Sequence, residues 1–394
     1  MDSISQIEID LSALEANLEA WSKALGSARI CGVVKAGAYG LGSVPIAQRL
    51  VKKGVGMLAV YSLAQATELA KAGVQADLLV LMPAEPIART DLIYRTAVTG
   101  RLHMTVHGAE ELQRVEEIGL KFGTKMPIHL KIDTGLGRLG MRPEEAEAIL
   151  EGLPKRRYIR LAGVFSHTAA PIKDPALMEK QRQLFEDFLS RNAERIGKDA
   201  LRHFAGTYAA QRDPKTHYDM VRLGLGLYGY GAAEAGPGPW AGPFDLKPVL
   251  RWTSRIVRLK EVPEGVGVGY NHLFTTKRPT RLAVMPVGYS DGYPLGLSNK
   301  AMVRVGEGLV PCPVVGQVNM DQTIIDVTDV EAVSVGDEVE LIGRDPEADN
   351  GLQKLAELAG SNPYEMLCRL SPHIKRRYVL INSQTGHVGH VVTV

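Results

Sequence analysis

The chain has 394 residues, 45% of them hydrophobic, and its 46 lysines and arginines nearly balance its 44 aspartates and glutamates. This length exceeds one ordinary core and predicts two domains, and a formal net charge of +2 without a long basic run argues against a nucleic-acid or membrane-surface partner. The three cysteines form no CxxC pair, and the N-terminus has neither an apolar signal core nor a membrane span, so we expect a cytoplasmic protein without a disulfide framework.

Short apolar runs alternate with amphipathic helical stretches from residue 30 to about 230, which is the period of βα units. No GxGxxG fingerprint follows the first apolar run, so these repeats favour a closed barrel over an open sheet. We predict an α/β chain with a (β/α)8 TIM-like barrel over residues 10–240. The expected strands are 30–35, 57–61, 77–82, 126–133, 161–167 and 218–224, and the clearest helices are 43–54, 62–73 and 175–196.

The second part of the chain has a different pattern. A stretch rich in glycine, proline and alanine at 232–248 predicts a linker. We predict a mostly antiparallel β domain over 241–394, to which an early strand within residues 1–9 is expected to pair. Its β-branched strands are expected at 251–262, 280–288, 301–318, 323–330 and 337–343, with a helix at 351–359.

Lys35 follows an apolar strand and precedes a glycine-punctuated turn, in the segment GVVKAGAYGLG. The C-terminal ends of barrel strands line the active site, so burial of an inward-facing Lys35 would lower its pKa toward nucleophilic competence, as a Schiff-base lysine requires. A strand-end lysine that extends into solvent fits this position equally well.

The lysine segment resembles the cofactor motif of alanine racemases, usually close to VVKADAYGHG. Further blocks resemble family blocks in the family order, and the similarity covers nearly the whole chain. It implies a pyridoxal-phosphate-dependent enzyme of fold type III that interconverts L-alanine and D-alanine and supplies D-alanine for peptidoglycan. The blocks are HLKIDTGLGRLGM (129–141), FSHTA (165–169), DMVRLGLGLYG (219–229), RLAVMPVGYSDGYP (281–294), VVGQVNMDQTIIDVTD (314–329) and NPYEMLCRL (362–370).

The resemblance implies two catalytic bases, one for each face of the substrate. Lys35 carries the cofactor and serves as one base, and Tyr270 matches the other. Tyr39 matches a phosphate-binding tyrosine. The positions that resemble the rest of the phosphate cradle are Thr207, Gly224, Leu225 and Tyr364.

Arg222 matches the arginine that faces the pyridine nitrogen of the cofactor. An arginine is always protonated, so it leaves that nitrogen unprotonated and favours reprotonation at Cα over transamination. His167 would lie against the cofactor ring. With His203 it would join Arg222 and Tyr270 in a hydrogen-bond chain that lowers the pKa of the tyrosine from its ordinary value of about 10.

Arg138 resembles the arginine that contacts the phenolic oxygen of the cofactor and the carboxylate of the substrate, which suits its planar fork. Lys131 matches a lysine that is carbamylated in many family members, whose anion then holds the arginine. An unmodified lysine beside Asp133 fits the sequence equally well.

Tyr289 resembles a residue at the entrance of the site, and Met320 resembles the one whose backbone N–H meets the substrate carboxylate. Asp291 and Asp321 could suggest a metal pair, but no third ligand stands at a suitable spacing, so we expect no metal. Because the family completes its site with the β domain of a second subunit, we expect a homodimer with shared active sites.

Four positions depart from the family pattern. Gly37 and Leu41 replace the usual Asp and His of the lysine motif, and Gly206 replaces a common Asn. These changes bear on cofactor affinity and on the loop geometry. Asn319 stands where many relatives have a small residue beside the substrate pocket, which bears on the substrate range.

Other functions remain open from the sequence. Asn319 and Gly206 are compatible with a broad-specificity or serine racemase on the same scaffold. A non-catalytic pyridoxal-phosphate-binding barrel would lack the β domain that carries Tyr270. An amino acid decarboxylase of similar plan would place an acid, not Arg222, at the pyridine nitrogen.

Overall fold

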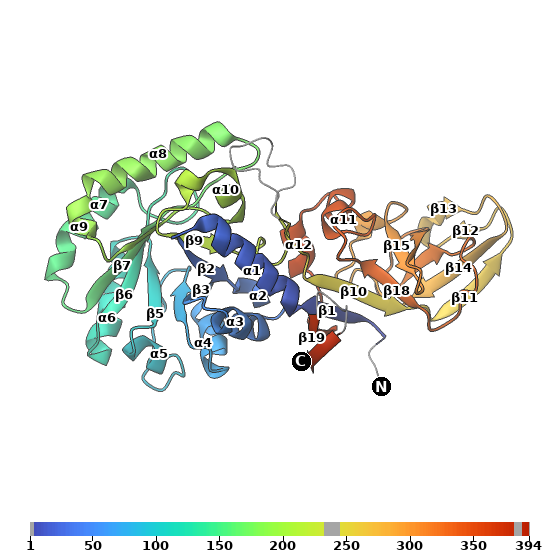
Figure 1. Ribbon diagram of the computed structural model, residues 1–394, viewed down its shortest axis with the longest axis horizontal. Helices are drawn as coiled ribbons and strands as arrows, with labels where there is room; N and C mark the ends of the chain where they lie inside the picture. Colours follow the sequence, from blue (N-terminus) through green and yellow to red (C-terminus); the bar gives the residue numbers. More distant parts are fainter. Residues whose placement is uncertain (1–3, 232–244, 382–387, 394) are drawn as a thin grey trace.

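The computed structural model describes residues 4–231, 245–381 and 388–393. A barrel built from the first part of the chain lies beside a β domain built from the last part, along the longest axis of the molecule (Figure 1). The predicted linker at 232–248 lies outside the described residues as far as residue 244, and so does the predicted domain boundary.

Eight parallel strands form the barrel sheet, in the order β8-β7-β6-β5-β4-β3-β2-β9. Two backbone hydrogen bonds join its outer strands, from Asp219 N to Arg202 O at 3.0 Å and from Arg222 N to Ala205 O at 3.1 Å. The predicted barrel is thus confirmed. The strands are β2 (Arg29–Val33), β3 (Met57–Val60), β4 (Asp77–Val80), β5 (Leu102–Val106), β6 (Met126–Lys131), β7 (Ile159–Phe165), β8 (Leu201–His203) and β9 (Met220–Leu223).

Helices cover the outside of this sheet (Figure 1). The Asp10 side chain caps the first helix by accepting from the backbone of Ser12 at 2.8 Å and of Ala13 at 3.1 Å. The predicted helix at 175–196 is two helices that meet at Asn192, whose φ of −115° interrupts the regular backbone. The helices are α1 (Leu11–Leu25), α3 (Ser43–Lys52), α4 (Leu63–Lys71), α5 (Tyr94–Val98), α6 (Ala109–Phe122), α7 (Pro143–Gly152), α8 (Pro175–Arg191), α9 (Ala193–Ile196) and α10 (Thr207–Arg212).

The β domain contains a seven-stranded sheet in the order β16-β15-β18-β10-β1-β19-β20. The early strand β1 pairs antiparallel with β10 and parallel with β19, so its predicted pairing with this domain is confirmed. The strands of this sheet are β1 (Gln6–Asp10), β10 (Leu250–Arg255), β15 (Met302–Val305), β16 (Val310–Pro313), β18 (Glu338–Ile342), β19 (Lys375–Ile381) and β20 (Val388–Thr393).

Two smaller antiparallel sheets complete the β domain. One has the order β11-β14-β17 and the other pairs β12 with β13. The predicted helix at 351–359 is α11 (Leu352–Leu358), and α12 (Pro363–Cys368) lies where the β domain meets the barrel (Figure 1). The strands are β11 (Arg258–Val262), β12 (Gly267–Val268), β13 (Phe274–Thr275), β14 (Thr280–Met285) and β17 (Thr323–Asp326).

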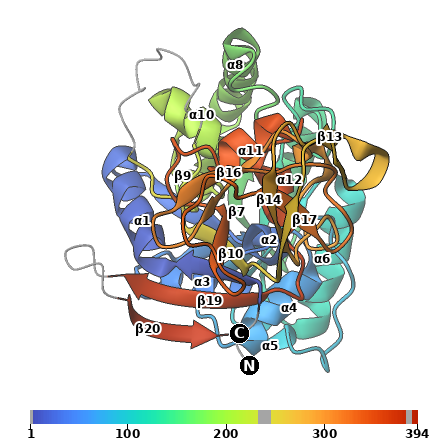
Figure 2. The ribbon, with the colours of Figure 1, turned by 90° about the vertical axis from the view of Figure 1, so that its right-hand side faces the viewer.

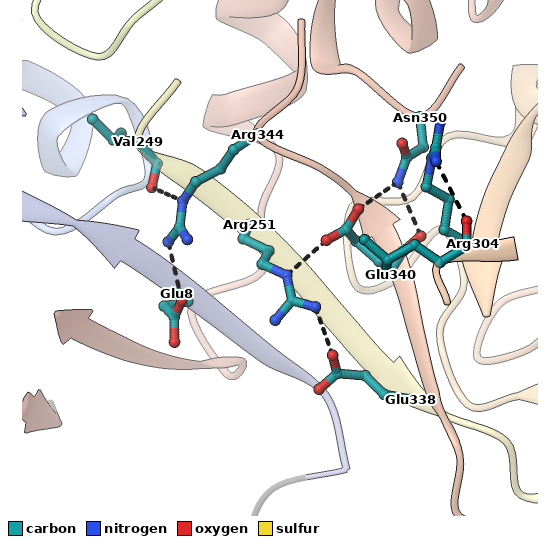
Figure 3. A network of polar contacts seen from close by, with 9 residues as sticks. Glu8, Val249, Arg251, Arg304, Glu338, Glu340, Arg344 and Asn350 are labelled. Atoms are coloured by element: carbon teal, nitrogen blue, oxygen red, sulfur yellow. Dashed lines mark hydrogen bonds and ion pairs between the residues drawn. The ribbon is translucent and has the colours of Figure 1, made fainter. Parts of the chain in front are cut away.

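Ion pairs connect strands that lie far apart in the sequence (Figure 3). Arg251 on β10 donates to Glu340 and to Glu338 on β18, each at 2.6 Å. Arg344 donates to Glu8 on β1 at 3.1 Å. Figure 2 shows β19 and β20 along one edge of the β domain. The first strand is therefore held within a domain otherwise built from the last part of the chain.

Candidate active site

A cavity of about 530 Å³ lies at the C-terminal ends of the barrel strands. This is the end at which barrel enzymes carry their chemistry. Ten residues predicted from the sequence line it together: Lys35, Tyr39, Lys131, Arg138, His167, Thr207, Arg222, Gly224, Leu225 and Tyr364.

The backbone after Lys35 forms a left-handed turn, α2 (Lys35–Tyr39). Ala36, Ala38 and Tyr39 have φ values of 52°, 51° and 58°, and Gly37 has 63°. This conformation costs a non-glycine residue about 1–2 kcal/mol, and such strain clusters at functional sites. The turn brings both Lys35 and Tyr39 to the cavity.

The C-terminal part of the chain supports this turn. Arg376 donates to the carbonyl of Gly40 at 3.0 Å, and the Tyr378 hydroxyl donates to the carbonyl of Leu41 at 2.9 Å. A Cβ at Gly40 would lie 2.4 Å from the carbonyl oxygen of Leu367, so the close approach of α12 requires glycine there. The strained turn is thus stabilised by packing from the second part of the chain.

The structure explains two of the four departures from the family pattern, Gly37 and Leu41, but not Gly206. Gly37 adopts its left-handed conformation without steric cost, and no atom lies within 4 Å of the position of its Cβ. Leu41 is fully buried, so a core contact replaces the usual histidine. Gly206 has a φ of −98°, which any residue can adopt, so glycine is not required there.

Arg222 on β9 is held from several sides. Its Nη1 donates to Nδ1 of His203 at 2.8 Å, and its Nη2 donates to the carbonyls of Ser166 at 2.8 Å and Phe204 at 3.0 Å, and to Nδ1 of His167 at 3.2 Å. Burial lowers the pKa of Arg222 to about 10, so it remains a cation at neutral pH. Its Nε takes part in none of the hydrogen bonds among the described residues, which leaves a fixed donor available at the cavity.

Burial lowers the pKa of both lysines of the cavity, which raises the fraction of neutral amine at a given pH. Desolvation, then the charge of Arg138, lower the pKa of Lys35. The same two causes lower the pKa of Lys131 to about 8. Both amines are therefore better nucleophiles than a surface lysine.

Arg138 lies on a loop organised by a single carboxylate. The Asp133 side chain accepts from the backbone N–H of Gly135 at 2.9 Å, Leu136 at 2.8 Å and Gly137 at 3.0 Å. Asp133 is thus engaged in building the loop, and the described residues show no hydrogen bond between it and Lys131. The loop presents the Arg138 guanidinium at the mouth of the cavity.

Hydroxyl groups gather at one end of the cavity. A Cβ at Gly224 would lie 2.2 Å from the phenol oxygen of Tyr39, so glycine lets this tyrosine approach the backbone. The rings of Tyr39 and Tyr364 are 5.7 Å apart. Thr207, the first residue of α10, accepts from the backbone N–H of Gly226 at 3.1 Å.

Tyr364 lines this cavity, but the other three predicted site residues of the β domain do not. Tyr270, Tyr289 and Met320 are 67%, 45% and 56% exposed. Neighbouring loops carry them, since Ser290 N donates to Met320 O at 3.0 Å and Asn271 donates to Gln317 at 3.1 Å. In one chain these side chains are therefore exposed and lie outside the cavity lining.

Sequence reasoning missed several residues that line the cavity or support it. The Phe165 ring lies 5.0 Å from the Arg222 guanidinium and 5.9 Å from the Lys131 amine. His129, which bonds to His203, lies two positions before Lys131 and so faces the same side of β6. The alternation of a strand could have identified His129, because residues i and i+2 share a face.

Two arginines, two lysines and no carboxylate line the cavity among the described residues. Such a site favours an anionic ligand. A strand-end amine, a fixed cationic donor and a cluster of hydroxyls fit the aldehyde, pyridine nitrogen and phosphate of pyridoxal phosphate. The fold and the site together define a cofactor enzyme built on a barrel with an attached β domain.

Comparison with known proteins gives the family. The family model for the alanine racemase N-terminal domain matches residues 9–232, and that for the alanine racemase C-terminal domain matches residues 249–378. The alanine racemase of Halothermothrix orenii is 37% identical over 374 residues, which cover 94% of this chain and 96% of that protein. The chain belongs to the alanine racemase family, whose members depend on pyridoxal phosphate.

Solved structures agree with this assignment. The alanine racemase of a D-cycloserine-producing Streptomyces lavendulae matches with a TM-score of 0.87 and 28% identity, over 98% of this chain and 100% of that one. The alanine racemase of Bartonella henselae, with covalently bound pyridoxal phosphate, matches with a TM-score of 0.81 and 26% identity, over 96% of this chain and 100% of that one. Among the described residues, no helix is long and apolar enough to cross a bilayer.

Proposed function

We propose that this chain interconverts L-alanine and D-alanine, with Lys35 and Tyr270 as the bases on opposite faces of the substrate. The observation that carries the proposal is that one cavity joins Lys35, Arg138 and Arg222, while Tyr270 extends from the β domain. Racemisation requires a proton to leave Cα on one side and to return on the other. The product would supply D-alanine for peptidoglycan in the cytoplasm.

The cofactor withdraws electrons from the substrate when it is bound and so weakens the Cα–H bond. Lys35 would hold it covalently, and its lowered pKa favours the neutral amine that this bond requires. Tyr39, Thr207 and Tyr364, with the backbone of Gly224 and Leu225, would hold its phosphate.

Arg222 would direct its free donor at the pyridine nitrogen, with His167 against the cofactor ring. A cation at this position opposes protonation of the nitrogen and limits electron withdrawal. The proton at Cα is therefore returned quickly, which favours racemisation over transamination.

Arg138 would bind the substrate carboxylate at the mouth of the cavity, together with the backbone N–H of Met320. Lys131 is a candidate for carbamylation, because a carbamate forms on a neutral amine and burial lowers the pKa of Lys131 to about 8. The resulting anion would hold Arg138 in place. Intact-mass measurement in bicarbonate buffer, compared with Lys131→Met, tests this modification.

A second copy of the chain would complete the site. Tyr270, Tyr289 and Met320 are exposed and lie outside their own cavity, so the proposed two-base mechanism requires them to reach the cavity of a partner. A twofold homodimer would supply each cavity with the partner's loops.

Subunit mixing tests the shared site. Lys35→Ala and Tyr270→Phe are each expected to be almost inactive alone. A mixed dimer has one cavity with both bases intact, so random exchange should restore about a quarter of wild-type activity. No recovery, with subunit exchange shown independently, would mean that each cavity uses the tyrosine of its own chain.

A racemisation assay on a panel of amino acids tests the substrate. One observation supports serine as a second substrate, because Oδ1 of Asn319 is buried without a hydrogen-bond partner among the described residues. This oxygen could accept a bond from a substrate hydroxyl near Met320. Serine turnover that falls in Asn319→Ala, with alanine turnover retained, would support this wider range.

A further inference from the structure

Three histidines form a continuous chain through the barrel core. His203 on β8 meets His129 on β6, with Nε2 and Nδ1 2.9 Å apart, and His129 meets His103 on β5 with the same two atoms 2.9 Å apart. At one end, Arg222 donates to Nδ1 of His203 at 2.8 Å. At the other end, Nε2 of His103 lies 3.7 Å from the carboxylate of Asp77.

The two ends of this chain lie at opposite ends of the barrel. Arg222 faces the active-site cavity, whereas Asp77 begins β4. Asp77 and His103 line a second cavity of about 550 Å³, at the N-terminal ends of the strands. Arg160, at the start of β7, lines the same cavity and lies near His103.

Arg222 determines the direction of every hydrogen bond in the chain. Arginine has no acceptor, so Nδ1 of His203 must accept, and a neutral His203 then carries its proton on Nε2. That N–H donates to Nδ1 of His129, which in turn donates from Nε2 to His103. His103 therefore directs its own Nε2–H toward Asp77.

The protein environment keeps these imidazoles neutral. Burial lowers the pKa of His129 and of His203 well below the ordinary value, and it lowers the pKa of His103 to about 3. All three histidines are buried. One tautomer of each histidine thus remains fixed over the physiological pH range.

Arg222 is a buried cation whose hydrogen-bond partners are all neutral. An isolated buried charge is unfavourable unless polar groups compensate it. Aligned hydrogen bonds polarise one another, so an acceptor at the far end strengthens the bond at the near end. The carboxylate of Asp77, 3.7 Å from the last imidazole, lies beyond hydrogen-bond distance and acts on this chain through its charge.

The fold provides space for this chain. A Cβ at Gly163 would lie 2.3 Å from Nδ1 of His129, so β7 carries glycine where the central histidine crosses the barrel. Arg222 can donate to His203 whether or not His203 is bonded to the other two histidines. The extension through His129 and His103 is a separate feature of the barrel core.

We propose that His103 and Asp77 are positioning residues for Arg222, acting through an aligned imidazole chain that spans the barrel. Asp77 makes the last imidazole a stronger donor, and each bond along the chain then makes His203 a stronger acceptor for Arg222. The inference rests on the proposed role of Arg222 at the cofactor. It assigns a function to the end of the barrel remote from the chemistry.

NMR of the holoenzyme labelled with ¹⁵N in its histidine rings tests the chain. We expect Nε2 to carry the proton in His103, His129 and His203, with signals assigned by single substitutions. Asp77→Asn should shift the Nδ1 signal of His203, two rings away, and lower kcat/KM about two- to fivefold. Asp77→Glu should partly restore the Nδ1 signal of His203 and kcat/KM, because it restores the negative charge.

Asp199→Asn is the matched control. Asp199 lines the same cavity, and its substitution removes the same charge, whereas the ion pairs among the described residues join His103 to Asp77 and not to Asp199. It should leave the His203 signal unchanged. An Nδ1–H tautomer at His129 or His203 in the wild-type protein would overturn the proposal, and so would equal effects of Asp77→Asn and Asp199→Asn.

The outcomes separate this inference from the proposed function. Full racemase activity with an unmoved His203 signal in Asp77→Asn would overturn the role of Asp77 alone. A wild-type protein without racemase activity would overturn the proposed function, while the NMR tautomers would still decide whether the chain exists. The wild-type spectrum decides this even where a variant fails to fold.

Discussion

The phenol oxygen of Tyr39 lies 2.2 Å from the position that a Cβ atom would take at Gly224. Gly224→Ala must therefore displace this tyrosine from the hydroxyl end of the cavity. We expect the affinity for pyridoxal phosphate to fall at least about tenfold, equal to about 1.4 kcal/mol, in titrations of the apoprotein. Gly152→Ala on α7 is the control, because it lies outside the cavity and no atom lies within 4 Å of the position of its Cβ. Equal affinities in both variants would contradict this role of Gly224.

Lys35→Ala tests the covalent attachment of the cofactor. The wild-type holoenzyme should show a visible absorbance band that survives gel filtration, because the amine of Lys35 binds the cofactor covalently. The variant should lose this band. Borohydride reduction followed by peptide mass spectrometry should place the label on Lys35, and a label on Lys131 instead would reassign the nucleophile.

The buried histidines predict a loss of stability in acid. His103 takes up a proton near pH 6.5 in the unfolded chain but only at about 3 in the native protein, because burial lowers its pKa. The unfolded state binds more protons in this window, so the free energy of unfolding falls as the pH falls. Each such histidine contributes about 1.4 kcal/mol per pH unit.

Urea unfolding of the holoenzyme across this window measures the slope, at fixed protein and cofactor concentrations. His103→Gln should reduce the slope by about one proton. An unchanged slope in this variant would show that His103 titrates alike in both states.

The sequence predicted the architecture because periodicity and glycine-rich turns act locally. Two barrel strands were not predicted. They are β5, where His103 and Thr105 are polar although they are buried, and β8, which has only three residues. In both strands, inward polar side chains or short length hide the apolar pattern on which strand prediction depends.

The site was predicted through family resemblance more than through local pattern. The left-handed turn at 36–39 depends on Arg376 and Tyr378, which follow it by more than 300 residues, so no local signal reveals it. The exposure of Tyr270 was likewise implied only by the family's shared sites. The exposed position of Tyr270 on the β domain agrees with that expectation.

Arg222→Glu should change the reaction rather than only slow it. A glutamate in place of this cation would favour a protonated pyridine nitrogen and stronger electron withdrawal. We expect slower racemisation, a species absorbing at longer wavelength during turnover, and more transamination product. Unchanged spectra and an unchanged partition between products would mean that Arg222 does not face the cofactor ring.

Tyr270→Phe tests the two-base assignment through a symmetry of the reaction. L- and D-alanine are mirror images, so their equilibrium constant is one, and net conversion must fall equally in both directions. Loss of one positioned base should cost about 10²–10⁴ in kcat/KM each way.

Exchange of the α-hydrogen with water need not be symmetric. If Lys35 serves the D face and Tyr270 the L face, the variant should still exchange α-deuterium from D-alanine, while exchange from L-alanine is largely lost. NMR in ordinary water with each deuterated enantiomer measures the two faces separately. Tyr158→Phe serves as the control, because this tyrosine directly precedes β7 and does not line the cavity. Equal loss of exchange from both enantiomers would contradict the assignment of one base to each face.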